Sequence, residues 1–234
     1  MQAKRGFVPD DVRNFSSNGI AKMRTASRDI RYLINHGYDL KSATTFTGNH
    51  YLLSERQRMA LMRSICTDEQ YINRKRKELS EKDLKDQDVW IDGFNQIITL
   101  EVLHSHSVLL SCMDGCIRDL ASLRGSYHLI PETYEAISMM LEELKGMHVS
   151  KCHILLDEPV SNSGRLKTRI AEINEQKDAL NIEIQILKNV DRTLYDKENV
   201  ITSDSTILDH CQSWFNLNAV CVREQKAETY TVYQ

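Results

Sequence analysis

The chain has 234 residues, of which 41% are hydrophobic and 27% charged, a composition that suits one large globular domain or two modest ones. It contains no run of about 18 apolar residues, and no apolar stretch follows its basic first residues, so we expect neither a membrane span nor a secretory signal and place the protein in the cytoplasm. Its six cysteines form no C-x-x-C pair, which argues against structural zinc and against a disulfide framework.

Basic and acidic residues are unevenly divided along the chain. The first 77 residues contain 15 lysines and arginines against 7 aspartates and glutamates, a net charge of +8, whereas the remainder contains 15 against 26, a net charge of −11. This division indicates either that the basic part faces a polyanion while the acidic part holds cations, or that the two parts attract each other.

Residues 1–77 are predicted to form a basic helical domain. Between residues 16 and 36, apolar side chains such as Ile20, Met23 and Ile30 recur at about the 3.6-residue period of a helix. Shorter helices are expected at residues 40–46 and 54–63. Arginines on these helices are candidates for gripping nucleic-acid phosphates, the alternative being a solvated basic surface. These candidates are Arg24, Arg28, Arg31, Arg56, Arg58 and Arg63.

Residues 78–87 are mostly charged and are predicted to be a linker or connecting helix before an α/β domain at residues 88–234. From residue 88 onward, short apolar runs alternate with helical patterns, which is typical of a mainly parallel sheet with flanking helices. The predicted strands are residues 89–92, 108–113, 152–157, 182–187, 199–204 and 219–222. The predicted helices are residues 95–104, 117–123, 132–146, 165–179 and 206–214.

Four of the predicted strands end in an aspartate or are directly followed by one: Asp92, Asp114, Asp157 and Asp204. Because ligands of parallel sheets bind beyond the carboxyl ends of the strands, these side chains are expected to share one edge. Each aspartate taken alone is as well explained as a helix cap or a turn residue. Four together would repel one another unless a cation neutralised them, and hard oxygen ligands suit Mg²⁺ or Mn²⁺. We therefore expect all four to be metal ligands.

Further polar residues follow these aspartates in the sequence. Asn95 lies three residues after the first, Ser161 lies in a polar loop after the third, and Thr202 precedes the fourth. Asp209 lies five residues after Asp204, so that both can reach one ion if they begin the same helix. These four and Asp114 are the predicted supporting residues.

Three of these motifs together carry a resemblance. The order strand-Asp-Gly-x-Asn at residues 92–95, strand-Asp-x-Pro at 157–159 and strand-Thr-Ser-Asp at 202–204 resembles the PIN-like nuclease superfamily, nearest to its NYN branch. The resemblance implies a Rossmann-like fold and a carboxylate cluster that hydrolyses RNA with Mg²⁺ or Mn²⁺. It implies catalytic roles for Asp92, Asp157 and Asp204. Thr206 stands where NYN proteins often have another aspartate, for which Asp209 would have to compensate.

The segments at residues 5–14 and 48–64 also resemble the prokaryotic family called domain of unknown function 434, here joined to a second such domain. This resemblance implies that the basic helical part and the α/β part occur together. G-x-S-x-G, Walker A and G-x-G-x-x-G motifs are absent, which argues against a hydrolase elbow, a P-loop and a dinucleotide site.

Three functions remain open on this reading. The first is a Mg²⁺- or Mn²⁺-dependent ribonuclease whose partner is RNA or else DNA. The second is a non-catalytic RNA- or nucleoprotein-binding module with a degenerate PIN-like domain. The third is a Rossmann-like nucleotide or phosphate binder, which the four aspartates disfavour because a phosphate beside them would need a bridging metal. The sequence leaves the oligomeric state open, with a dimer among the possibilities.

Overall fold

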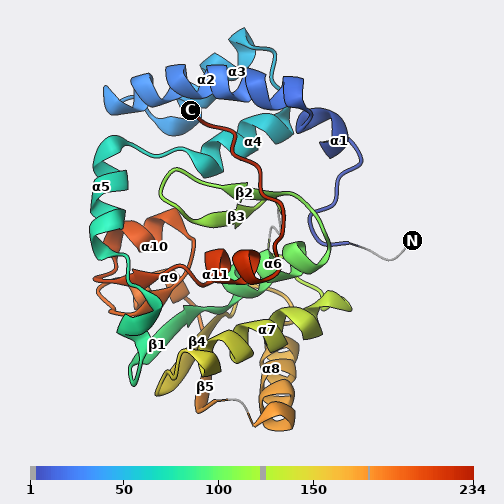
Figure 1. The fold of residues 1–234 in the computed structure, drawn as a ribbon, viewed down its shortest axis with the longest axis vertical. Helices are drawn as coiled ribbons and strands as arrows, with labels where there is room; N and C mark the ends of the chain where they lie inside the picture. The colour runs from blue at the N-terminus through green and yellow to red at the C-terminus, as the bar shows by residue number, and fades with distance from the viewer. Residues whose placement is uncertain (1–3, 122–124, 179) are drawn as a thin grey trace.

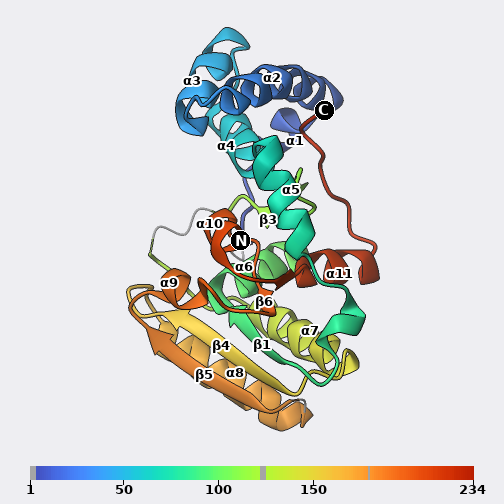
Figure 2. The same cartoon turned by 90° about the vertical axis from the view of Figure 1, so that its left-hand side faces the viewer.

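The computed structural model describes residues 4–121, 125–178 and 180–234, and it consists of a helical unit stacked on an α/β unit (Figures 1 and 2). The helical unit contains α1 (Asp11–Asn14), α2 (Ser17–Asn35), α3 (Leu40–His50), α4 (Glu55–Ser64) and α5 (Asp68–Lys77). A 3-10 turn, η1 (Glu81–Leu84), leads into the α/β unit. No helix of the described ranges is long and apolar enough to cross a bilayer.

The helices of the first unit begin at residues that cap them. The side chains of Ser16, Asp39, Ser54 and Thr67 each accept a hydrogen bond from a backbone N–H in the first turn of the helix that follows. In α4 and α5 a glutamine three residues later returns the bond, which completes a capping box. The helices predicted at residues 16–36 and 54–63 are thereby confirmed, and α3 runs four residues past its predicted end.

The α/β unit is built on a parallel sheet of five strands in the order β5-β4-β1-β6-β7. The strands are β1 (Asp88–Asp92), β4 (Lys151–Asp157), β5 (Ile182–Leu187), β6 (Val200–Ile201) and β7 (Trp214–Phe215). Four of them overlap predicted strands because each is a short apolar run between turn residues, although β6 covers only residues 200–201 of the strand predicted at 199–204. The predicted fold class, a helical N-terminal part followed by a mainly parallel sheet with flanking helices, is confirmed.

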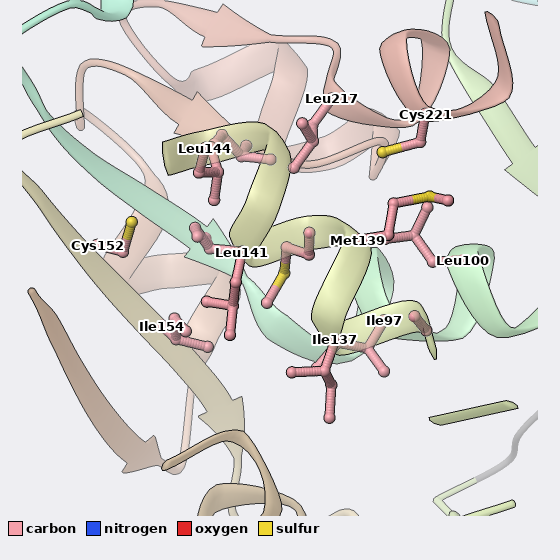
Figure 3. Packing of buried hydrophobic residues seen from close by; sticks show 14 of the residues in the cluster. Ile97, Leu100, Ile137, Met139, Leu141, Leu144, Cys152, Ile154, Leu217 and Cys221 are labelled. Carbon is pink, nitrogen blue, oxygen red and sulfur yellow. The ribbon is translucent and has the colours of Figure 1, made fainter. Parts of the chain in front are cut away.

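Helices cover both faces of this sheet. One face packs against α6 (Gly93–His104), α7 (Glu132–Gly146), α8 (Ser163–Lys177) and α11 (Leu217–Glu224). Figure 3 shows Leu141 of α7 beside Ile154 of β4 within this core. The opposite face carries the two short helices α9 (Val190–Leu194) and α10 (Ser205–His210).

Two predictions around residue 115 are wrong. The run at 108–113 does not join the parallel sheet: β2 (Leu109–Ser111) pairs antiparallel with β3 (Ile117–Asp119) in a separate hairpin. The helix predicted at 117–123 is replaced by β3, and its residues 122–123 lie outside the described ranges. Gly115, with φ of +89°, turns the chain between the two strands in the left-handed region that glycine tolerates.

The predictions near the C-terminus also need correction. The sixth strand expected at 219–222 is part of α11, which Asn216 caps by accepting from the N–H of Ala219. The helix expected at 206–214 ends at His210, and Trp214 begins β7 instead. The helix expected at 165–179 is α8, whose predicted last residue, 179, lies outside the described residues.

A second apolar core joins the two units. Side chains of α2, α3 and α4 pack with Leu110, Cys112 and Leu120 from the hairpin and with Val232 from the end of the chain. The backbone of Tyr230 also bridges to Leu110. The connecting segment packs as well, since Leu84 is fully buried and the N–H of Leu79 donates to the carbonyl of Trp214 at 2.8 Å.

Candidate functional site

The parallel sheet brings three of the predicted aspartates to one edge. Asp92 is the last residue of β1, Asp157 is the last residue of β4, and Asp204 follows β6. Because β4, β1 and β6 are neighbours and run in parallel, their carboxyl ends lie side by side. We call these residues, together with Asp191 described below, the acidic edge.

Asp92 is the buried member of the acidic edge. It precedes α6, yet its side chain makes no capping bond to that helix. Its Oδ2 accepts a hydrogen bond from Thr202 Oγ1 at 2.8 Å. Burial raises the pKa of Asp92 to about 8, and the carboxylates of Asp204, Asp157 and Asp191 add to the rise, whereas the Thr202 bond opposes it. A buried carboxyl surrounded by other carboxylates therefore keeps its proton at neutral pH unless a cation is present.

Asp191 is a member of the acidic edge that the sequence analysis missed. It lies in the first turn of α9, directly after β5. Asp191 is exposed as a residue, but partial desolvation of its carboxyl raises its pKa, and Asp204 adds to this; burial and then Asp191 raise the pKa of Asp157. The signal that could have found Asp191 is its position, since the segment leaving β5 ends at the same edge as the other strands.

Asp204 combines the two interpretations that the sequence left open. Its Oδ1 accepts from the N–H of Thr206 at 2.8 Å and from the N–H of Ile207 at 3.1 Å, so it caps α10. Its charge nevertheless raises the pKa of Asp92 and of Asp191. A capping role and a role in the acidic edge are therefore compatible.

Two of the predicted supporting residues connect the loops around the acidic edge. Thr202 Oγ1, besides donating to Asp92, accepts from the N–H of Asp204 at 3.0 Å. Asn95 Oδ1 accepts from both the N–H and the hydroxyl of Ser203, each at 2.9 Å. These bonds hold the exit of β6 against the start of α6 and fix the position of Asp92 relative to Asp204.

Gly93 allows α6 to begin immediately after Asp92. A Cβ atom on this residue would lie 2.8 Å from the carbonyl oxygen of Leu155 and 2.7 Å from a methyl of Leu156, closer than packing permits. Only glycine therefore lets the first turn of α6 lie against β4 at this point.

Asp114 and Asp209 do not belong to the acidic edge, and their assignment to it needs correction. Asp114, in the hairpin turn, accepts from Arg74 at 2.7 Å and from Arg118 at 2.6 Å. Burial alone would raise the pKa of Asp114, but the two arginines lower it to about 2. Asp209 lies near the end of α10, opposite to Asp204, and is held by Arg74 at 2.7 Å and by Gln70 at 3.0 Å.

Ser161 also contacts other residues than those of the acidic edge. Its hydroxyl donates to the carbonyl of Tyr127 at 3.1 Å and accepts from the N–H of the same residue at 2.9 Å. It fixes the loop after β4 to the segment before α7.

The six arginines predicted to bind nucleic acid all bond within the chain. On α2, Arg24 donates to the carbonyl of Thr231, Arg28 to the side chain of Gln234, and Arg31 to Asp68. On α4, Arg56 donates to Asp11 and to the carbonyl of Leu120, Arg58 to the carbonyl of Leu53 and to Asn49, and Arg63 to the carbonyl of Asp119. Arg24 and Arg28 remain exposed, whereas Arg56 is enclosed.

Several basic residues of the helical unit contact the α/β unit. Arg63 reaches Asp119 at the end of β3, Arg56 reaches Leu120 after it, and Arg74 of α5 binds Asp114 and Asp209. Lys77 donates to the carbonyls of Leu208 and Asp209. The structure agrees with the interpretation that the basic and acidic parts attract each other.

The donor chemistry of the acidic edge suits a hard cation, but the side chains do not form a closed coordination shell. Within residues 4–121, 125–178 and 180–234, no group of three or more His, Cys, Asp or Glu side chains is close enough to hold a metal ion. Carboxylate oxygens are the ligands that Mg²⁺ and Mn²⁺ prefer. Binding would therefore require the carboxylates to move closer together.

Comparison with known proteins gives matches along most of the chain. Residues 81–220 match the family described as "Domain of unknown function (DUF5616)", and residues 22–77 match "Protein of unknown function (DUF434)". The second match confirms the predicted resemblance of the basic helical part. The chain is 39% identical over 185 residues to "Uncharacterized protein MJ0935" of Methanocaldococcus jannaschii; the aligned residues make up 78% of this chain and 87% of that protein. No solved structure gives a significant match.

Proposed function

This chain belongs to the family described as Domain of unknown function (DUF5616), and we propose that its activity is metal-dependent hydrolysis of RNA phosphodiester bonds at the acidic edge. The proposal includes a relationship of the α/β unit to PIN-like nucleases of the NYN branch. Mg²⁺ or Mn²⁺ would be held by Asp92, Asp157, Asp191 and Asp204. An ion held there supplies an activated water and neutralises charge on the phosphate.

The observation that carries the proposal is the convergence of four carboxylates from distant segments around the buried Asp92. Unpaired like charges destabilise a fold, and the acidic edge contains no arginine or lysine bonded to Asp92 among the described residues. Strongly shifted pKa values of this kind concentrate at functional sites. The chain's own part in the reaction is to orient these carboxylates through Thr202 and Asn95.

The proposed RNA contact is the exposed side of α2. Arg24 and Arg28 are exposed there, each bonded only to the end of the chain in the contacts described above. Tyr32, one turn after Arg28, has 64% of its surface exposed and can stack on a base. Phosphate contacts of this kind give binding that weakens steeply with salt.

A second candidate is a non-catalytic RNA-binding module. The capping bonds of Asp204 and the absence of a closed ligand group in the described ranges favour it. In that case Asp92 is a buried acid whose role is structural.

The test is cleavage of labelled single-stranded RNA, with DNA of the same sequence beside it, in the presence of Mn²⁺ or of a chelator. We expect cleavage that needs the metal, and Asp92→Asn should lower its rate about a hundredfold, which corresponds to a few kcal/mol of lost transition-state stabilisation. The matched control is Asp88→Asn, at the other end of β1 and half exposed, which should retain the activity.

RNA that binds to the protein without metal-dependent cleavage would favour the second candidate. Cleavage that persists equally in Asp92→Asn would show that the activity does not arise at the acidic edge.

A further inference from the structure

The two outer strands of the parallel sheet differ in how the chain protects them. At one end, β7 is covered by the connecting segment, because Glu78 bridges to Trp214 and the N–H of Leu79 donates to the carbonyl of Trp214. At the other end, β5 is last in the strand order and pairs only with β4. Figures 1 and 2 both place β5 and α8 at the end of the molecule farthest from α2 and α3.

The backbone groups of β5 alternate between β4 and the outside. The carbonyls of Asn181 and Leu187 accept from Cys152 and Glu158 of the β4 segment, at 2.9 Å and 2.8 Å. Since the direction alternates along a strand, the N–H and C=O groups of Ile182, Ile184 and Ile186 point away from β4. A row of free donors and acceptors on an edge strand is a template for another strand.

The side chains of β5 lack the usual protection of an edge. Natural edges are blocked by proline, bulges or inward-pointing charges, yet β5 reads Ile-Glu-Ile-Gln-Ile-Leu. Its one charged residue, Glu183, is already held by Lys151 at 2.6 Å and by Gln185 at 2.6 Å. The three isoleucines pack only partly against the core and keep the rest of their surface accessible.

The helix beside β5 is charged in a way that complements a second copy of itself. The first half of α8 contains Arg165, Lys167 and Arg169, all exposed, whereas its second half contains Glu172 and Glu175, also exposed. Arg169 lies 3.3 Å from Glu172 of the same helix, and Lys177 in the last turn is held by Glu142 of α7 at 2.6 Å. A twofold axis that pairs two β5 strands antiparallel also places the two α8 helices antiparallel. The basic half of each helix would then face the acidic half of the other.

We propose that β5 and α8 form the interface of a homodimer in which two β5 strands pair antiparallel and join two sheets into one. The occupant is a second copy of this chain because the backbone groups of the edge and the charges of the helix are complementary to those of a second copy. The two elements are each about 20 Å long, as six strand residues and fifteen helix residues require. An isologous contact of this kind closes at two subunits and leaves the helical units at the far ends.

The first test is the mass of the full chain by size-exclusion chromatography with light scattering over a range of concentrations. We expect twice the mass of the chain for the wild type and the mass of one chain for Ile184→Lys, which puts a charge in the pairing edge. The control is Leu52→Lys, at a residue 81% exposed on the helical unit, which should leave the dimer intact. Circular dichroism shows whether each variant is folded.

A second variant tests the pairing of the α8 helices. The double variant Arg165→Glu and Arg169→Glu should raise the dissociation constant of the dimer at least tenfold. Adding Glu172→Arg and Glu175→Arg to the same chain should restore the dimer, because the twofold axis places the first half of each α8 helix against the second half of the other.

Amide hydrogen exchange tests the pairing directly. The amides of Ile182, Ile184 and Ile186 should be protected in the wild type, and those of Ile182 and Ile186 should exchange faster in Ile184→Lys. The amides of Glu183 and Gln185, which face β4, should be protected in both. A wild-type chain that stays monomeric overturns the proposal, even if β5 pairs with a strand of another protein. A dimer that dissociates in Leu52→Lys but not in Ile184→Lys overturns it as well.

Discussion

Asp92 and Asp114 are both buried aspartates of the α/β unit, with 5% and 1% of their surface exposed, yet their pKa values move in opposite directions. Burial and three other carboxylates raise the pKa of Asp92 to about 8. Around Asp114 burial acts in the same sense, but Arg118 and Arg74 overcome it and lower the pKa to about 2. The comparison shows that the partners, more than the depth, decide the charge of a buried acid. Asp114 therefore stabilises the fold, and Asp92 is the candidate for function.

The largest expected effect comes from removing the paired acid. Asp114→Asn leaves the buried Arg118 without a carboxylate partner and leaves Arg74 with Asp209 alone, and breaking a buried ion pair from one side costs about 3–5 kcal/mol. Urea unfolding measures this loss of the free energy of unfolding. Asp209→Asn is the control, since Asp209 is at the rim and Arg74 keeps Asp114, so its loss should be clearly smaller. Equal losses in the two variants would contradict the central role of Asp114.

The sequence predicted that aspartates gather at one edge of the sheet, but it did not predict correctly which aspartates lie there. Asp92, Asp157 and Asp204 each follow a short apolar run, and a parallel sheet necessarily brings such positions to one edge. Asp114 follows a similar run, but that run pairs within a local hairpin. Local pattern alone does not distinguish a strand of the central sheet from one arm of a hairpin, because both are short and apolar.

The errors near residues 214–222 have a similar cause. The run at 219–222 is short and wholly apolar, so its pattern fits a strand and a helix equally well. The side chain of Asn216 caps the first turn and thereby favours the helix. The pairing of arginines across the two units was open in the sequence because it depends on contacts between residues such as Arg56 and Leu120, which lie 64 positions apart.

The second prediction concerns the pH dependence of stability. The folded-state pKa of Asp92 lies above its ordinary value of 3.8, so the unfolded chain releases its proton first and the contribution of this group falls as pH rises from about 4 to about 8. Asp92→Asn removes this loss. In metal-free buffer we expect the free energy of unfolding of the variant, relative to that of the wild type, to increase by about 2 kcal/mol between pH 4 and pH 8. This is less than the shift at about 1.4 kcal/mol per pKa unit would give, because water and neighbouring groups relax around the charge.

Thermal unfolding at a series of pH values measures this difference, with Asp88→Asn as the control on the same strand. A difference between wild type and Asp92→Asn that stays constant with pH would show that the pKa of Asp92 is not raised.

The smallest effect is expected at the bond to Thr202. Thr202→Val keeps the shape of the side chain but removes the donor to Asp92, at a cost of about 1 kcal/mol for a buried hydrogen bond. Because this bond lowers the pKa of Asp92, its loss should raise that pKa further. The carboxyl chemical shift of Asp92 followed by NMR during a pH titration gives the change. An unchanged midpoint would mean that Thr202 does not act on Asp92.

The most direct test of the acidic edge is calorimetric titration with Mn²⁺ at pH 7 in two buffers that differ in ionisation enthalpy. Since Asp92 holds its proton at this pH, we expect Mn²⁺ to bind to the wild type and release about one proton, and neither binding nor release in Asp92→Asn. A wild-type chain that binds no Mn²⁺, or that binds it equally well as Asp92→Asn, would contradict the account.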